Sequence, residues 1–130
     1  MILDSSAIVA VLRAEPEASA FAKAIASSGK CYVSPVNYVE AAVVIDKGGD
    51  AFASRRFDDF MRASQITVAA VTPEQAKIAR QAYRDFGKGR HKAGLNFGDC
   101  FAYALAKEMD EPLLFKGDDF CHTDVEGAKT

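Results

Sequence analysis

The sequence has no tryptophan, only three cysteines, and no hydrophobic run near the roughly 20 residues needed to cross a membrane. The cysteines are far apart and follow no metal-binding or redox spacing, so we expect reduced thiols in the core rather than disulfides. Neither sign of charge dominates, because 16 Lys and Arg stand against 18 Asp and Glu, for a net charge of −2. Any contact with nucleic acid must therefore come from a local basic patch.

The amino end also lacks the features of an export signal. Residues 1–3 are apolar and Asp4 follows at once, so neither a basic segment nor a long hydrophobic segment is present. Together with the unpaired cysteines, this predicts a cytoplasmic protein. The chain has 130 residues, of which 49% are hydrophobic and 26% charged, so we expect a single domain over residues 1–130.

Short apolar segments alternate with pairs of helical segments along the chain. We expect strands at residues 1–3, 31–33, 66–68 and 112–115, and a further edge strand near residues 123–125. Capping residues mark the starts of the helices between them. Such alternation is typical of a parallel sheet with helices on both faces. We therefore predict an α/β fold of three layers, with a central, mostly parallel sheet of four to five short strands.

Residues 95–106 form one largely apolar stretch that we expect to be helical, and its only carboxyl group is Asp99. Ala102, Tyr103 and Ala106 lie on the same helical face as Asp99. We expect that face to be buried, which would point Asp99 inward. An ionised carboxylate is costly there unless it is protonated, paired or bound to a cation. Asp99 is therefore a candidate functional residue.

A second acid, Glu40, is placed in a similar way. It is the only charge between Val36 and Ile45, in a helix that we expect over residues 35–47, after the capping residue Ser34. This helix is apolar nearly all round, so we expect most of it to be buried. Glu40 is therefore a second inward-pointing candidate.

Acidic residues also follow two of the expected strands. Asp4 comes directly after residues 1–3, and Asp118 and Asp119 come after residues 112–115. In parallel sheets, ligand sites gather outside the carboxyl ends of the strands. Asp4 is equally well explained as a cap of the helix that follows it.

If these acids converge, their mutual repulsion raises their pKa values unless a cation offsets it. The set offers only oxygen donors, which select a hard ion such as Mg²⁺ or Mn²⁺. Carboxylate clusters that hold such ions are a means of phosphodiester hydrolysis. The acids therefore predict a metal-dependent site only if the fold brings them together.

A glycine-rich loop at residues 87–94 directly precedes the Asp99 helix and carries Lys88, Arg90 and Lys92. One interpretation is a flexible, solvated loop. The other is a mobile basic arm that contacts the phosphates of a nucleic acid. The sequence alone supports both about equally.

Four sequence blocks occur in order and at suitable spacing over nearly the whole chain. They are Asp4-Ser5-Ser6-Ala7 after the first strand, Glu40 after Ser34-Pro35, Asn96-Phe97-Gly98-Asp99-Cys100, and Leu114-Phe115-Lys116-Gly117-Asp118-Asp119-Phe120. Together they resemble a PIN domain, and more narrowly the VapC toxins of bacterial VapBC toxin–antitoxin pairs. The last two blocks are the most specific, whereas the opening block alone would be weak.

This resemblance implies a Mg²⁺-dependent endoribonuclease, with Mn²⁺ as a substitute, that hydrolyses structured RNA, often tRNA. It implies that Asp4 and Asp99 are metal ligands and that Glu40 is a third catalytic acid. Glu40 would reach the ion through water or orient the nucleophile. For the fourth acid the sequence favours Asp118 and leaves Asp119 open.

The resemblance also places Ser6 at a small polar position near the ion. It further implies a homodimer and a cognate VapB-type antitoxin that blocks the site. Lys88, Arg90 and Lys92 become candidate RNA contacts.

Three other functions are compatible with parts of the sequence. A phosphatase with Asp4 as nucleophile would usually have a second Asp two residues later, where this chain has Ser6. A receiver-like signalling module needs a phosphorylatable Asp after its central strand, and only Ala69-Ala70-Val71 follow Val68. A PIN-like module that only binds RNA or a partner remains an alternative, although the presence of all four acids argues against it.

Overall fold

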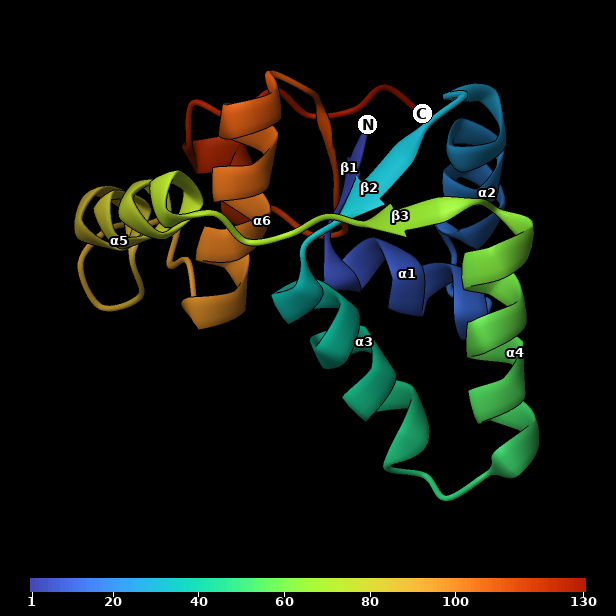
Figure 1. The fold of residues 1–130 in the computed structure, drawn as a ribbon. Coiled ribbons are helices and arrows are strands. Elements are labelled where there is room, and N and C mark those ends of the chain that lie inside the picture. Colours follow the sequence, from blue (N-terminus) through green and yellow to red (C-terminus); the bar gives the residue numbers. More distant parts are fainter.

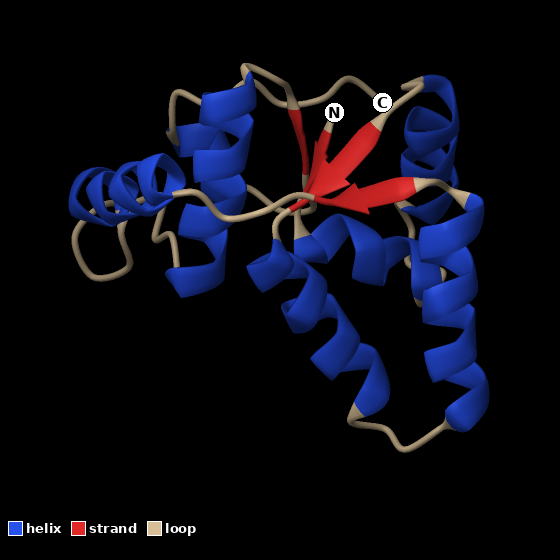
Figure 2. Cartoon of the chain, in the orientation of Figure 1, coloured by secondary structure: helices blue, strands red, loops and turns tan.

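In the computed structural model, which describes residues 1–130, four parallel strands lie between two groups of helices (Figures 1 and 2). The strands are β1 (Ile2–Leu3), β2 (Cys31–Val33), β3 (Ile66–Val68) and β4 (Leu113–Leu114), and they pair in the order β3-β2-β1-β4. The helices are α1 (Ser5–Leu12), α2 (Ala18–Ser27), α3 (Pro35–Asp46), α4 (Ala51–Ala63), α5 (Pro73–Phe86) and α6 (Phe97–Met109). The predicted α/β fold with a parallel sheet is confirmed. No helix is both long and apolar enough to span a membrane.

The central strand β1 separates two hydrophobic cores. Because successive side chains of a strand point to opposite faces, Leu3 packs into the core formed with α1 to α4, and Ile2 into the core formed with α5 and α6. Both side chains are fully buried. Ile2 pairs with Tyr32 of β2 and with Leu113 of β4, so the strand ends are in register. This register brings the residues after β1 and β4 to the same edge of the sheet.

The carboxyl-terminal segment differs from the prediction, because residues 123–125 form no strand. Instead, a short 3-10 helix, η1 (Asp119–His122), follows β4, and the chain makes only an isolated bridge to the sheet, between Gly127 and Leu113. Asp124 accepts a hydrogen bond from the Tyr103 hydroxyl at 2.6 Å. This contact ties the segment to α6 rather than to the sheet edge.

The cysteines are free, as predicted, but only two of them are core residues. Cys31 and Cys100 are buried, whereas Cys121 is exposed. The expectation of three core thiols is wrong for Cys121 because Phe120 is the residue of η1 that fills the core.

Helix α3 is less buried than its composition predicts. Its buried residues are Asn37, Ala41 and Ile45, while Val39 and Val43 are each 55% exposed. The helix therefore packs through one side only, and Glu40 lies at the margin of that side.

Candidate carboxylate site

Asp4 connects β1 to α1 and is only 3% exposed. Its Oδ2 accepts hydrogen bonds from the Ser6 backbone N–H at 3.0 Å and from the Ser6 hydroxyl at 2.6 Å. The Ser6 oxygen in turn accepts from the Lys116 N–H at 3.0 Å, just beyond β4. Asp4 is therefore the cap of α1, which is one of the two roles that its place in the sequence suggested. The cap uses one oxygen only, and Asp4 Oδ1 is buried without a hydrogen-bond partner.

Glu40 contacts the first turn of α6. Its Oε1 accepts hydrogen bonds from the Ser5 hydroxyl at 3.1 Å and from the Asn37 amide at 2.9 Å. The same amide donates to the Gly98 carbonyl at 3.0 Å. A Cβ atom added to Gly98 would overlap the Glu40 carboxylate. Three residues that the prediction did not include, Ser5, Asn37 and Gly98, thus hold Glu40 in place.

Asp99 lies in the first turn of α6 rather than within the helix. α6 begins at Phe97, two residues later than predicted. Asn96 Oδ1 accepts the Asp99 N–H at 2.8 Å, and Asp99 Oδ2 accepts the Asn96 N–H at 3.0 Å, which makes a reciprocal capping box. Asn96, an amide residue three positions before an acid, indicates this start of the helix in the sequence. The predicted burial of Ala102 and Ala106 on the same helix is confirmed.

The acids influence one another electrostatically. The pKa of Asp99 is raised to about 7, chiefly by burial and then by the negative charges of Asp4, Asp119 and Glu40, while the Asn96 N–H lowers it. Burial also raises the pKa of Asp4, and the charge of Glu40 adds to this. Carboxyl groups that are far apart in the sequence therefore share one region of the fold.

The two acids after β4 are not equivalent. Asp119 is among the residues whose charge raises the pKa of Asp99, and Asp118 is not. Both are exposed, and Asp119 begins η1. Of the two acids, Asp119 is therefore the one whose charge acts on Asp99, and the choice of the fourth acid stays a prediction.

These residues fit a hard divalent cation by their chemistry. They offer only oxygen ligands, and Asp4 Oδ1 is a buried acceptor that lacks a partner. No three His, Cys, Asp or Glu side chains form a group that could hold a metal ion by themselves. Mg²⁺ keeps several of its waters and is usually bound by only one or two carboxylates of the protein, so a pair of carboxylates is compatible with its binding.

The glycine-rich loop before α6 is closed at its base by backbone hydrogen bonds. Lys88 N–H donates to the Leu95 carbonyl and Leu95 N–H to the Phe86 carbonyl, both at 2.9 Å, which closes the base of the loop. Ala93 and Leu95 are fully buried and anchor it. These contacts fix the base of the loop, and its contact with a nucleic acid stays a prediction. Its cations are all exposed: Lys88, Arg90 and Lys92.

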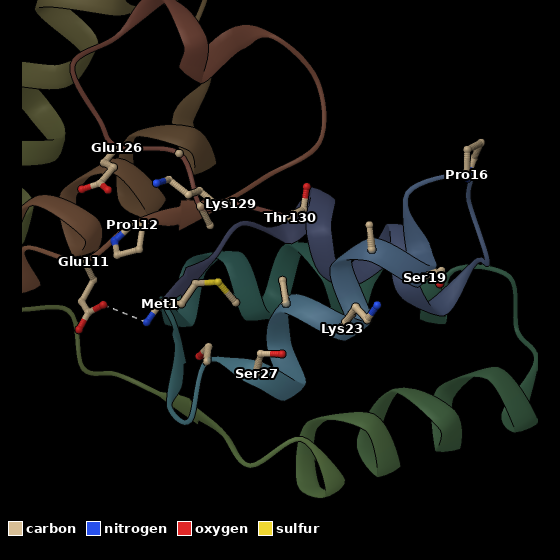
Figure 3. A pocket seen from close by; sticks show the side chains of 15 residues that line it. Met1, Pro16, Ser19, Lys23, Ser27, Glu111, Pro112, Glu126, Lys129 and Thr130 are labelled. Atoms are coloured by element: carbon tan, nitrogen blue, oxygen red, sulfur yellow. Dashed lines mark hydrogen bonds and ion pairs between the residues drawn. The ribbon is translucent and has the colours of Figure 1, made fainter.

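A wide cleft of about 990 Å³ lies away from these acids, at the opposite edge of the sheet (Figure 3). It is lined by residues of α2 and of the carboxyl-terminal segment, and by Met1, whose amino group pairs with Glu111 at 3.1 Å. None of the candidate acids lines this cleft. Its size therefore says nothing about the carboxylate site.

Comparison with known proteins identifies the family of the chain. A family model described as "PIN domain" matches residues 1–126. The chain belongs to the PIN-domain family. It is 48% identical over 129 residues to ribonuclease VapC28 of Mycobacterium tuberculosis, covering 98% of this chain and 97% of the relative. It is 46% identical over 125 residues to ribonuclease VapC of Mycolicibacterium smegmatis, covering 96% and 97%. The predicted relationship to the VapC ribonucleases is confirmed.

Two solved structures have the same fold. M. tuberculosis VapC20, described as a toxin that cleaves the sarcin–ricin loop, matches with a TM-score of 0.69, covering 98% of each chain at 17% identity. A toxin–antitoxin complex from Klebsiella pneumoniae matches with a TM-score of 0.69, at 15% identity, covering 95% of this chain and 92% of that one. At this identity the likeness concerns the fold alone. The prediction of an RNA-cleaving enzyme is confirmed at the level of the family, by the VapC ribonucleases.

Proposed function

We propose that this protein is a divalent-metal-dependent endoribonuclease that acts as the toxin of a toxin–antitoxin pair. Relatives that carry the name VapC ribonuclease, at 46–48% identity over nearly the full length, support the reaction class. One observation supports the metal dependence above all: Asp4 Oδ1 is buried without a partner. A carboxyl group in that position must either be protonated or lie next to a cation.

Asp4 and Asp99 would hold Mg²⁺, for which Mn²⁺ can substitute, and Glu40 and Asp119 would complete the four-carboxylate site. When bound, the ion would supply an activated water and stabilise the charge on the phosphate. The protein's own residues fix the ligands. Ser6 holds one oxygen of Asp4 and leaves the other free. The capping box in the same way fixes one oxygen of Asp99.

The substrate in this proposal is structured RNA, including tRNA. The exposed cations of the loop that precedes α6 support it, because phosphate contacts from Lys and Arg position RNA without reading its sequence. VapC20, which shares the fold, is described as a toxin that cleaves the sarcin–ricin loop.

The proposed partner is a VapB-type antitoxin that covers the site, and both proteins would act in the cytoplasm. The fold shared with a toxin–antitoxin complex from Klebsiella supports this partner. We also propose a homodimer, which light scattering on the purified chain tests directly. A mass of one chain, 14.0 kDa, at working concentrations contradicts the dimer.

Cleavage of purified tRNA and ribosomal RNA fragments tests the function. We expect cleavage with Mg²⁺ or Mn²⁺ and none with EDTA, and we expect Asp4→Asn and Asp99→Asn to abolish it while circular dichroism stays native. Asp50→Asn is the matched control for Asp4, because Asp50 also caps a helix, by accepting the Phe52 N–H at 2.9 Å, but is exposed. Cleavage in EDTA contradicts metal dependence. Binding of RNA without cleavage would favour the alternative of a non-catalytic binding module.

A further inference from the structure

Asn37 is a polar residue on the buried side of α3, and its side chain is fully buried. The residues that share this side, Ala41 and Ile45, are apolar. Burying an amide costs free energy unless its polar atoms find hydrogen-bond partners. The contacts of this amide therefore show what it does in the core.

The two N–H groups of Asn37 join two helices. One contact goes to Glu40 Oε1 at 2.9 Å, one turn further along α3, and the other to the Gly98 carbonyl at 3.0 Å, in the first turn of α6. The Ser5 hydroxyl, from α1, is the second donor to the same Glu40 oxygen. Glu40 Oε2 accepts no hydrogen bond from the protein. The carboxylate is thus held by one oxygen and offers the other.

Both donors to Glu40 are neutral. A Lys or Arg in their place would neutralise the carboxylate and compete with a cation for it. An amide and a hydroxyl fix its orientation and leave its charge available. Gly98 supports the same arrangement, because a side chain there would occupy the space of the Glu40 carboxylate.

We propose that Asn37 is a positioning residue of the carboxylate site. It fixes Glu40 against the amino end of α6, next to Asp99, so that Glu40 Oε2 is available to a divalent ion or to its water shell. This inference rests on the proposed metal-dependent function. Residues that orient the groups around a metal typically change metal affinity or activity by about 10- to 100-fold when they are replaced.

The chain contains a matched control for the structural cost of losing such an amide. Gln75, at the start of α5, is 2% exposed, and its amide also donates to one carboxylate and one carbonyl. These acceptors are Glu108 Oε1 at 2.8 Å and the Ala70 carbonyl at 3.1 Å. Gln75 Oε1, like Asn37 Oδ1, is buried without a partner. Gln75 differs from Asn37 in contacting none of the four candidate acids.

The experiment compares Asn37→Leu with Gln75→Met, which replace each amide by an apolar side chain of similar size. We expect both to lower Tm, because each leaves acceptors without their donor. Only Asn37→Leu should weaken Mn²⁺ binding in calorimetry and lower kcat for RNA cleavage, each by about tenfold or more. KM for RNA should change less than about twofold, because the RNA-binding surface is untouched. Native Mn²⁺ binding and kcat in Asn37→Leu would overturn the proposal.

A double-mutant cycle with Glu40→Gln tests whether Asn37 acts through Glu40. We expect Asn37→Leu to weaken Mn²⁺ binding in the native chain but not further in Glu40→Gln, because the group to be positioned is already changed. If the two substitutions weaken Mn²⁺ binding additively, Asn37 does not act through Glu40. If Asn37→Leu does not fold, Asn37→Ser takes its place in the same cycle. A native chain that neither binds Mn²⁺ nor cleaves RNA overturns the proposed function itself, which is a different result from native behaviour of the Asn37 variants.

Discussion

Gly98 of α6 and Glu40 of α3 are packed so closely that a side chain at position 98 would displace the Glu40 carboxylate. An added Cβ would overlap the carbon and both oxygens of the Glu40 carboxylate. Gly98 has no positive φ, so the position requires a glycine for space and not for its backbone conformation. Residues 58 positions apart in the sequence thus determine how near the acid of α3 comes to the acid of α6.

Gly98→Ala should therefore damage both stability and activity. The added methyl group must displace the Glu40 carboxylate, which is the end of a flexible side chain, so we expect a cost in stability at the low end of the about 1–3 kcal/mol that is typical of overpacking. We expect a lower Tm and at least a tenfold loss of RNA cleavage. Gly48→Ala is the control, because the added Cβ would meet nothing nearer than the Ile45 carbonyl at 3.9 Å. The backbone of Gly48 also has no positive φ. Native cleavage by Gly98→Ala would mean that the position of Glu40 does not matter.

The raised pKa of Asp99 predicts how the stability of the metal-free protein depends on pH. Its pKa is raised by burial from 3.8 to about 7, so the folded state binds the proton more tightly than the unfolded state. The stability that this group contributes is fully present below about pH 4 and is lost as pH rises through about 7. The metal-free chain should therefore lose stability between these values.

Asp99→Asn isolates this effect, because the amide cannot ionise and its oxygen can still accept the Asn96 N–H. We expect similar Tm values for the variant and the native chain near pH 4, and a higher Tm for the variant at pH 8. A difference of 1 kcal/mol corresponds to roughly 4 °C in a domain of this size. Mn²⁺ at pH 8 should raise the Tm of the native chain only. A Tm difference that stays constant with pH would contradict the raised pKa.

Local sequence patterns were sufficient for the elements that carry the acids. The strand before Asp4 and the helix after Ser34 follow from apolar runs and capping residues, and both lie where they were predicted. Asp4 and Glu40 could be singled out because each is the only acid in an apolar setting. The capping box of Asp99 was also readable, from Asn96, but the apolar run that begins at Leu95 suggested an earlier start of the helix.

The contacts between elements could not be predicted in this way. Asn37 reads as one polar residue in an apolar helix, and nothing near it in the sequence shows that it bonds to the Gly98 carbonyl 61 residues away. The choice between Asp118 and Asp119 depends on the turn into η1. After this turn, only the charge of Asp119 raises the pKa of Asp99. These relationships depend on packing at long range, which local propensity does not encode.

Replacing each acid after β4 separately tests this choice. Asp119→Asn removes a charge that raises the pKa of Asp99, so we expect that pKa to fall and RNA cleavage to drop by about tenfold or more. Asp118→Asn should change neither, because Asp118 is not among the residues whose charge raises the pKa of Asp99. NMR titration of the carboxyl groups and cleavage rates measure both effects. The reverse result, with activity lost only in Asp118→Asn, would mean that Asp118 is the fourth acid.

The exposed cations of the loop between α5 and α6 give a prediction about salt. If Lys88, Arg90 and Lys92 each contact one RNA phosphate, replacing all three by Gln should reduce the slope of log K against log salt by about 2, at roughly 0.7 for each contact with a single strand. RNA binding should weaken at low salt and change less at high salt. The guanidinium of Arg90 lies 5.5 Å from the Tyr83 ring centre, so Tm is recorded to check that the loop stays closed.

Neutralising three cations elsewhere separates a local patch from an effect of net charge. Lys47 directly follows α3, and Arg55 and Arg56 lie in α4. All three are exposed, and none of them forms an ion pair. Their replacement by Gln changes the net charge from −2 by the same amount as the loop variant does. Because phosphate contacts act within a Debye length of about 10 Å, only the loop variant should lose salt dependence. Equal slopes for both variants would mean that the loop is a solvated segment with no part in binding RNA.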